Sequence, residues 1–181
     1  MKRAGLICAF VLAGCAAGPS WRPSSDASMR VYTLGKLSFE APADWTMRGT
    51  QSNVKLVSPD ELARLEVRML EVGASEPECM ASAEHSLERG SPGLQKIRRS
   101  ETTVAGRRAL AQEADAPVAG SATPWHGWAY AICDGGTQYR IFFTGLSPIA
   151  PDTLGVHRRV VSTAKLDGGK RAAARGAGKR G

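Results

Sequence analysis

The chain has 181 residues, a formal net charge of +7 and 43% hydrophobic residues, which suits one domain with a core plus terminal tails. The positive excess is confined to the two ends, and the body between them holds as many basic as acidic residues. A neutral body has no electrostatic footprint for DNA or RNA, so we expect no nucleic-acid partner. No stretch reaches the roughly 18 to 20 apolar residues that a membrane-spanning helix needs.

Residues 1–14 have the features of an export signal, with a basic start and an apolar run of about ten residues. The run ends in Leu12, Ala13, Gly14 and Cys15, the order of a bacterial lipobox. Small side chains let the peptidase close on the backbone, and the cysteine thiolate is the nucleophile that accepts the lipid. We therefore expect cleavage between Gly14 and Cys15 and lipidation of Cys15. The alternative is an ordinary secretory signal with a chance cysteine.

Residues 15–30 are rich in Ala, Gly, Pro and Ser and are interpreted as a flexible tether that follows the lipidated cysteine. Two or more acyl chains hold a protein firmly on a bilayer. Ala16 follows the cysteine, which in enteric bacteria favours the outer membrane. The expected location is the cell envelope, with the domain exported from the cytoplasm and anchored to a membrane through Cys15.

Short strands are predicted at residues 31–34 and 36–40, around Gly35, and again at residues 54–58. Residues 64–72 alternate between apolar and charged side chains, which predicts a strand with one buried face.

A helix is predicted to follow, because Ser75 and Glu78 stand at the two positions of a capping box. Apolar residues recur on one helical face: Cys79, Met80, Ala83 and Leu87. Gly90 is a natural end for this helix.

Two hairpins are predicted next. Residues 97–104 and 107–116 form the first, and residues 125–133 and 137–145 form the second, around a Gly-rich turn. Residues 117–124, rich in Gly, Ser, Ala and Pro, are expected to be a loop between the hairpins.

Residues 152–164 are predicted to form a last helix that partly covers the sheet. Residues 167–181 consist almost only of Gly, Ala, Lys and Arg and are expected to be a disordered basic tail. The predicted class is α+β, a single domain over residues 31–166 with an antiparallel β-sheet flanked by a few helices.

The order of these elements and several short motifs resemble the PsbP-like/DcrB-like family. The motifs are Phe39-Glu40-Ala41-Pro42-Ala43-Asp44-Trp45, Val104-Ala105-Gly106 with Arg107-Arg108-Ala109, Tyr139-Arg140-Ile141-Phe142-Phe143-Thr144, and Val161-Ser162. The resemblance implies an α/β/α sandwich over residues 31–166. It also implies a binding or assembly module of exported proteins, since none of the motifs is catalytic.

Four cysteines are present. Cys8 leaves with the signal and Cys15 takes the lipid, so Cys79 and Cys133 remain as a pair in an oxidising compartment such as the periplasm. We expect them to form a disulfide worth about 3 to 4 kcal/mol in the chain-entropy model. The alternative is two buried free thiols.

Neither a metal site nor a cofactor is expected, because His85, His126 and His157 are far apart in the sequence. No nucleophile motif is present. A pair of His126 with Cys133 fails because their odd spacing puts them on opposite faces of one strand. We therefore expect no catalytic residue and no enzymatic activity.

The second hairpin concentrates aromatic side chains: Trp125, Trp128, Tyr130 and Tyr139. Cross-strand packing in the core is the favoured interpretation. The alternative is an aromatic groove that binds a peptide or glycan.

The expected function is that of a membrane-anchored envelope lipoprotein whose non-enzymatic domain binds or scaffolds a partner, an envelope protein or a glycan. A small-ligand carrier is a second possibility, which a deep apolar cavity beside the hairpin aromatics would favour. An envelope hydrolase with a site assembled only in the fold is a third.

Overall fold

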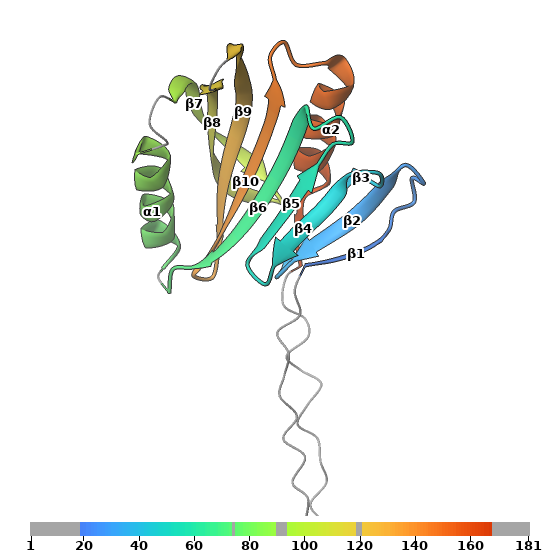
Figure 1. The fold of residues 1–181 in the computed structure, drawn as a ribbon. Coiled ribbons are helices and arrows are strands. Elements are labelled where there is room, and N and C mark those ends of the chain that lie inside the picture. Colours follow the sequence, from blue (N-terminus) through green and yellow to red (C-terminus); the bar gives the residue numbers. More distant parts are fainter. Residues whose placement is uncertain (1–18, 74, 90–93, 119–120, 168–181) are drawn as a thin grey trace, which may run out of the picture.

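The structure is a computed structural model that describes residues 19–73, 75–89, 94–118 and 121–167. These residues form two antiparallel sheets and two helices (Figure 1), which confirms the predicted α+β class. The larger sheet has seven strands in the order β4-β5-β6-β10-β9-β8-β7, and the smaller has four in the order β1-β2-β3-β11. The elements are β1 (Ser20–Pro23), β2 (Met29–Leu34), β3 (Leu37–Pro42), β4 (Thr46–Thr50), β5 (Asn53–Val57), β6 (Ala63–Glu71), α1 (Glu76–Arg89), β7 (Gln95–Val104), β8 (Arg107–Val118), β9 (Ser121–Asp134), β10 (Thr137–Leu146), α2 (Pro151–Thr163) and β11 (Lys165–Leu166).

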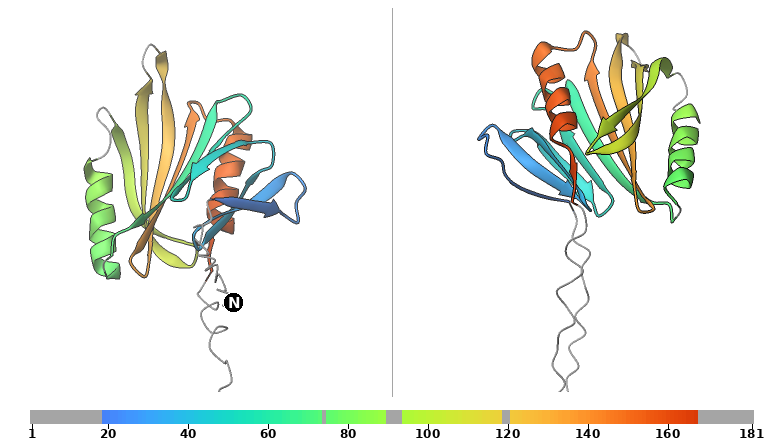
Figure 2. Two further views of the ribbon diagram at one scale, coloured as in Figure 1. Left: turned by 60° about the horizontal axis from the view of Figure 1, so that its bottom comes forward. Right: turned by 180° about the vertical axis from the view of Figure 1, so that it is seen from behind.

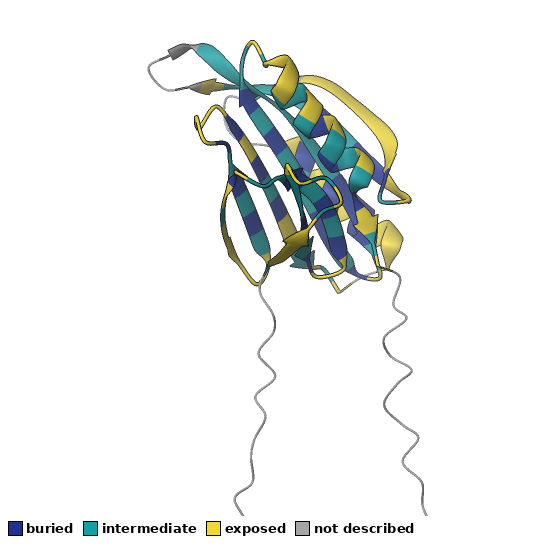
Figure 3. Cartoon of the chain, turned by 90° about the vertical axis from the view of Figure 1, so that its right-hand side faces the viewer, coloured by how far each residue is buried: buried dark blue, intermediate teal, exposed yellow. Residues whose placement is uncertain are grey.

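The seven-stranded sheet is covered differently on its two faces. Helix α1 packs on one face, over β8, β9 and β10, while α2 and the smaller sheet lie on the other (Figure 2). Along β6, Leu65 and Val67 are fully buried and Arg68 is exposed, so buried and exposed bands alternate along the strands (Figure 3). This period of two assigns one set of side chains to each face.

The main core lies between the seven-stranded sheet, the smaller sheet and α2. From the smaller sheet, Tyr32 and Phe39 stack with ring centroids 5.9 Å apart. On the side of the seven-stranded sheet, the ring centroids of Trp45 and Phe143 lie 6.1 Å apart. These aromatic rings join the two sheets into one hydrophobic core.

The turn between β2 and β3 requires glycine. Gly35 has φ +58°, and a Cβ there would lie 2.5 Å from Sδ of Met69 and 2.9 Å from Oη of Tyr139. The backbone N–H of Lys36 donates to the same Tyr139 oxygen at 3.1 Å. The glycine therefore lets this turn close on the buried end of β10.

Gly35→Ala is expected to lower the free energy of unfolding by about 2 to 4 kcal/mol, from the positive φ and the overpacking together. Gly73→Ala is the matched control, because Gly73 has φ +60° with nothing within 4 Å of its Cβ position. Urea unfolding of both variants measures the difference. Equal losses would show that crowding against Tyr139 contributes nothing.

Two segments differ from the expectation. Ser20–Pro23 lies within the predicted tether of residues 15–30, yet it forms β1 and pairs with β2. All four residues of β1 are exposed, so no hydrophobic alternation marks it as a strand. The described part of the domain thus begins ahead of Val31.

The second difference is the segment 117–124, whose prediction as a loop is wrong, since β8 extends to Val118 and β9 begins at Ser121. Pro117 lies at a register irregularity between Ala116 and Val118, where a strand tolerates a missing N–H. The predicted signal peptide, the cleavage and lipidation site at Gly14 and Cys15, and the basic tail from residue 168 lie outside the described residues. Within the described part of the chain, no helix has the length and apolar character needed to cross a bilayer.

Candidate functional site

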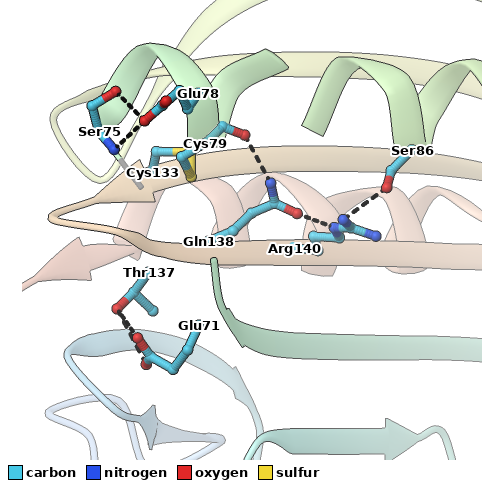
Figure 4. The surroundings of a disulfide bond; sticks show 9 residues. All are labelled: Glu71, Ser75, Glu78, Cys79, Ser86, Cys133, Thr137, Gln138 and Arg140. Atoms are coloured by element: carbon cyan, nitrogen blue, oxygen red, sulfur yellow. Dashed lines mark hydrogen bonds between the residues drawn. A yellow bond between two sulfur atoms is a disulfide. The ribbon is translucent and has the colours of Figure 1, made fainter. Parts of the chain in front are cut away.

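The predicted disulfide is formed. Cys79 and Cys133 are bonded, with their Cα atoms 6.1 Å apart, and both are buried. The bond ties the first turn of α1 to β9 (Figure 4). One half of the predicted capping box is present, since the backbone N–H of Ser75 donates to Oε2 of Glu78 at 2.9 Å. The Ser75 hydroxyl donates to the same carboxylate oxygen at 2.7 Å. These bonds hold the pKa of Glu78 below its ordinary value.

A depression on the α1 face lies between the end of α1 and the α1-facing side chains of β6, β8, β9 and β10. We call it the α1-side groove. Its volume is about 460 Å³, within the range of small-ligand pockets. The apolar part of its lining consists of Leu87, Leu94, Ala114, Ala116, Trp125, Gly127, Trp128, Ala129 and Phe142.

A chain of hydrogen bonds leads from the disulfide into this groove (Figure 4). The side-chain amide of Gln138 donates to the carbonyl oxygen of Cys79 at 3.0 Å. Its Oε1 accepts from Nε of Arg140, and Nη2 of Arg140 donates to the hydroxyl of Ser86 at 2.9 Å. The guanidinium of Arg140 is thus held in the groove by neutral partners on β10 and α1.

Further polar groups line the same groove. Gln112 is only 5% exposed, and its Oε1 has no hydrogen-bond partner among the described residues. Arg68 pairs with Glu66 at 2.7 Å, and its guanidinium also lies 5.4 Å from the ring centroid of Phe142. At the rim, the guanidinium of Arg64 lies 4.7 Å from the ring of Trp125. The groove therefore combines aromatic rings with several cations.

The opposite face carries a second group of residues, which we call the α2-side cluster: His126, Trp128, Tyr130 and His157. The rings of Trp128 and His157 stack at 4.2 Å between centroids, and Nε2 of His157 lies 3.0 Å from the Tyr130 hydroxyl. His126 meets the edge of Trp128 at 4.6 Å. The cluster thus joins α2 to the middle of β9.

The two histidines of this cluster have different surroundings. Nδ1 of His126 lies 2.7 Å from Oδ1 of Asp115, and its Nε2 lies 3.1 Å from Oε1 of Glu113. His157 is 8% exposed, and burial together with the charge of Arg158 lowers its pKa to about 4. Its imidazole is therefore neutral at physiological pH, and it acts as a packing group with one polar contact.

The four aromatic residues proposed as a groove do not gather in one place. Trp125 faces the α1 side and lines the α1-side groove. Trp128 and Tyr130 face the α2 side and pack against the main core. Tyr139 is 1% exposed and accepts a hydrogen bond from the Lys36 backbone. Three of the four therefore pack in or against the core, although Trp128 also borders the groove, and Trp125 stands in the groove itself.

The described residues assemble little reactive chemistry. Within residues 19–73, 75–89, 94–118 and 121–167, no group of three His, Cys, Asp or Glu side chains could hold a metal ion. Cys133 faces α1 while His126 faces the α2-side cluster, as their odd spacing predicts. The partners of the two cluster histidines are the carboxylates of Asp115 and Glu113 and the phenol of Tyr130.

The sequence pattern alone does not identify Gln112, Arg140 and Phe142 as members of one site. A signal was available for Arg140, because a charged residue between Tyr139 and Ile141 interrupts a strongly apolar strand. The buried Gln112 lies in a mixed strand of Ala, Gln, Glu and Asp, where no pattern marks it.

The chain matches no protein-family model and no curated protein sequence. Solved structures do resemble it. The cyanobacterial PsbP (CyanoP) of Synechocystis sp. PCC 6803 superposes with a TM-score of 0.54 at 12% identity, over 88% of this chain and 97% of that one. LpqN of Mycobacterium tuberculosis, described as involved in cell envelope biogenesis, gives a TM-score of 0.55 at 12% identity, over 82% and 90%.

A protein of Bacteroides thetaiotaomicron VPI-5482 gives a TM-score of 0.54 at 11% identity over 74% of this chain, which spans only 46% of that longer protein. Such low identities establish the fold and leave activity and partners open. The seven-stranded sheet between α1 and α2 is the α+β fold of PsbP-like proteins.

Proposed function

We propose that this chain is an exported lipoprotein of the bacterial cell envelope, anchored through Cys15, whose PsbP-like domain binds a partner without catalysing a reaction. The observation that carries the proposal is the placement of the chain ends. Ser20 pairs with Thr33, Thr33 with Ser38, and Ser38 with Lys165, so all four lie in one row at one end of the smaller sheet. Both described ends of the chain therefore leave the domain from that end, at the bottom of Figure 1.

This arrangement sets an orientation for an anchored protein. Four residues lie between Cys15 and Ser20, and these five Cα–Cα steps reach at most about 18 Å, so an acylated Cys15 would keep the row close to the membrane. The turn between β9 and β10 lies at the same end, because Lys36 pairs with Asp134 at 3.0 Å. Trp125 stands nine residues away along β9, about 30 Å from that end. An anchored domain would thus present the α1-side groove away from the bilayer.

Two further observations support export. The Cys79–Cys133 disulfide is of a kind that persists in oxidising compartments. Similarity to CyanoP and to the envelope protein LpqN fits a domain that works outside the cytoplasm.

The anchor has a direct test. In cells fed alkyne-palmitate, the protein is expected to become labelled, and Cys15→Ser is expected to abolish the label because it removes the acylated thiol. Cys8→Ser is the matched control, since Cys8 leaves with the signal and its replacement keeps the label. Labelling of the Cys15→Ser protein, or an intact mass that still begins at Met1 in the wild type, would contradict the anchor.

Among the other candidate functions, the small-ligand carrier gains support from the α1-side groove, which lies beside Trp125 as a carrier would require. The hydrolase gains none from the α2-side cluster, because His126 lies beside Asp115 and Glu113 and His157 lies beside Tyr130.

A further inference from the structure

The α1-side groove has an apolar floor of small side chains flanked by two aromatic rings. Ala129 and Gly127 leave the middle of the floor open, while Trp125 and Phe142 stand on neighbouring strands. Leu87 of α1 forms part of the wall. This shape accepts a flat or extended hydrocarbon body, for which burial of apolar surface supplies the binding energy.

The polar side of the groove is arranged around Arg140. Its Nε and Nη2 are occupied by Gln138 and Ser86, and no carboxylate of the described residues lies within ion-pair distance of it. Burial, with a contribution from the charge of Arg68, lowers the pKa of Arg140, although a guanidinium stays charged at neutral pH. A partly buried cation held by neutral partners retains donors for an anion.

The surrounding charges favour the same kind of ligand. Among the described residues that line the groove, the two cations Arg68 and Arg140 outnumber the one carboxylate, Glu66, so the charge of this lining is positive. Arg64 lies next to the lining, against the ring of Trp125. Glu66 is already bonded to Arg68. The buried amide of Gln112, with an unpartnered Oε1, supplies a further polar atom for a ligand headgroup. A side-chain amide can present its NH₂ instead by rotation.

We propose that the α1-side groove binds a small amphipathic organic acid, whose apolar body lies on Trp125, Phe142 and the alanine floor and whose carboxylate accepts hydrogen bonds from Arg140. The inference deepens the proposed function and rests on it, because it names the ligand class that the exported domain would take. The ligand is a free small molecule with one anionic head.

The test uses a matched pair of probes, 2-naphthylacetate and its neutral amide, 2-naphthylacetamide. Each is titrated into the full chain carrying Cys15→Ser, so that no acyl chain competes for the groove. The tryptophan indole N–H signals are followed by NMR and assigned with Trp125→Phe. 2-Naphthylacetate is expected to shift the indole N–H signal of Trp125 and to leave the signal of Trp21 unchanged. It is also expected to bind about tenfold more tightly than the amide, as a charge-assisted hydrogen bond predicts.

Arg140→Gln is expected to reduce the affinity for the carboxylate to that for the amide. Arg158→Gln, on the opposite face of the sheet, is the control and should change the affinity for neither probe. Glu66→Gln removes the one carboxylate among the described lining residues and is expected to raise the affinity for 2-naphthylacetate two- to threefold, a gain that an unfolded protein would not give. Equal affinities for the two probes in the wild type would overturn the anion site, and an unshifted Trp125 would overturn the groove. Neither result bears on acylation of Cys15, which the palmitate experiment tests separately.

Discussion

Replacing Cys79 and Cys133 together by serine is expected to lower the free energy of unfolding by about 3 to 4 kcal/mol. The disulfide closes a loop with a sequence separation of 54 residues, and in the chain-entropy model a loop of that size gives about 4 kcal/mol, the upper end of this range. Urea unfolding followed by circular dichroism measures the loss. Wild-type protein in reducing agent should match the double variant, which should itself be insensitive to reductant. Coincident unfolding curves for the oxidised wild type and the double variant would refute the prediction.

The same substitution should affect the groove, because α1 depends strongly on this bond. Four residues of the helix are buried, and two of them, Cys79 and Ala83, are small. The next attachment is polar, through Arg140 to Ser86 and through Gln138 to the Cys79 carbonyl. Without the disulfide, we expect the wall of the groove to loosen and the Trp125 signal to lose its response to 2-naphthylacetate.

Much of the fold could be predicted because burial leaves a periodic trace in the sequence. Apolar and charged side chains alternate along β6, and this alternation predicts a strand. Ser75 and Glu78, at the spacing of a capping box, predict the start of α1. Strand β1 left no such trace, since it is held by backbone pairing with β2 and all its side chains are exposed. Residues without a buried face carry no period, so pattern reasoning assigns them to a tether.

The candidate site was harder to predict because it depends on which face each side chain takes. Trp125 and Trp128 are an odd number of residues apart on β9, so their assignment to opposite faces follows from the period of a strand once the strand is known. The meeting of His157 with Trp128 has no such signal. It depends on how α2 crosses the sheet, which sequence spacing does not encode.

The titration of His157 is expected to make the protein acid-sensitive. Its pKa is about 4 in the folded protein, lowered from 6.5 chiefly by burial and further by the charge of Arg158. The nearby groups are Glu113, whose charge acts in the opposite direction, and His126. Between pH 6.5 and 4 the unfolded chain binds a proton at this residue and the native protein does not. The free energy of unfolding therefore falls as the pH falls through this window, by about 3 kcal/mol at pH 4.

Urea unfolding at pH 7 and at pH 4 tests this directly. His157→Gln is neutral at both pH values and can still hydrogen-bond to Tyr130, so its loss of stability over this interval should be about 3 kcal/mol smaller than that of the wild type. His85→Gln is the control, because His85 is exposed on α1 and its replacement should leave the wild-type difference intact. Carboxylates protonate equally in all three proteins, so they cancel in the comparison. An identical pH dependence in the wild type and His157→Gln would mean that the imidazole takes up its proton within the fold, with α2 moving away from Trp128 to admit water.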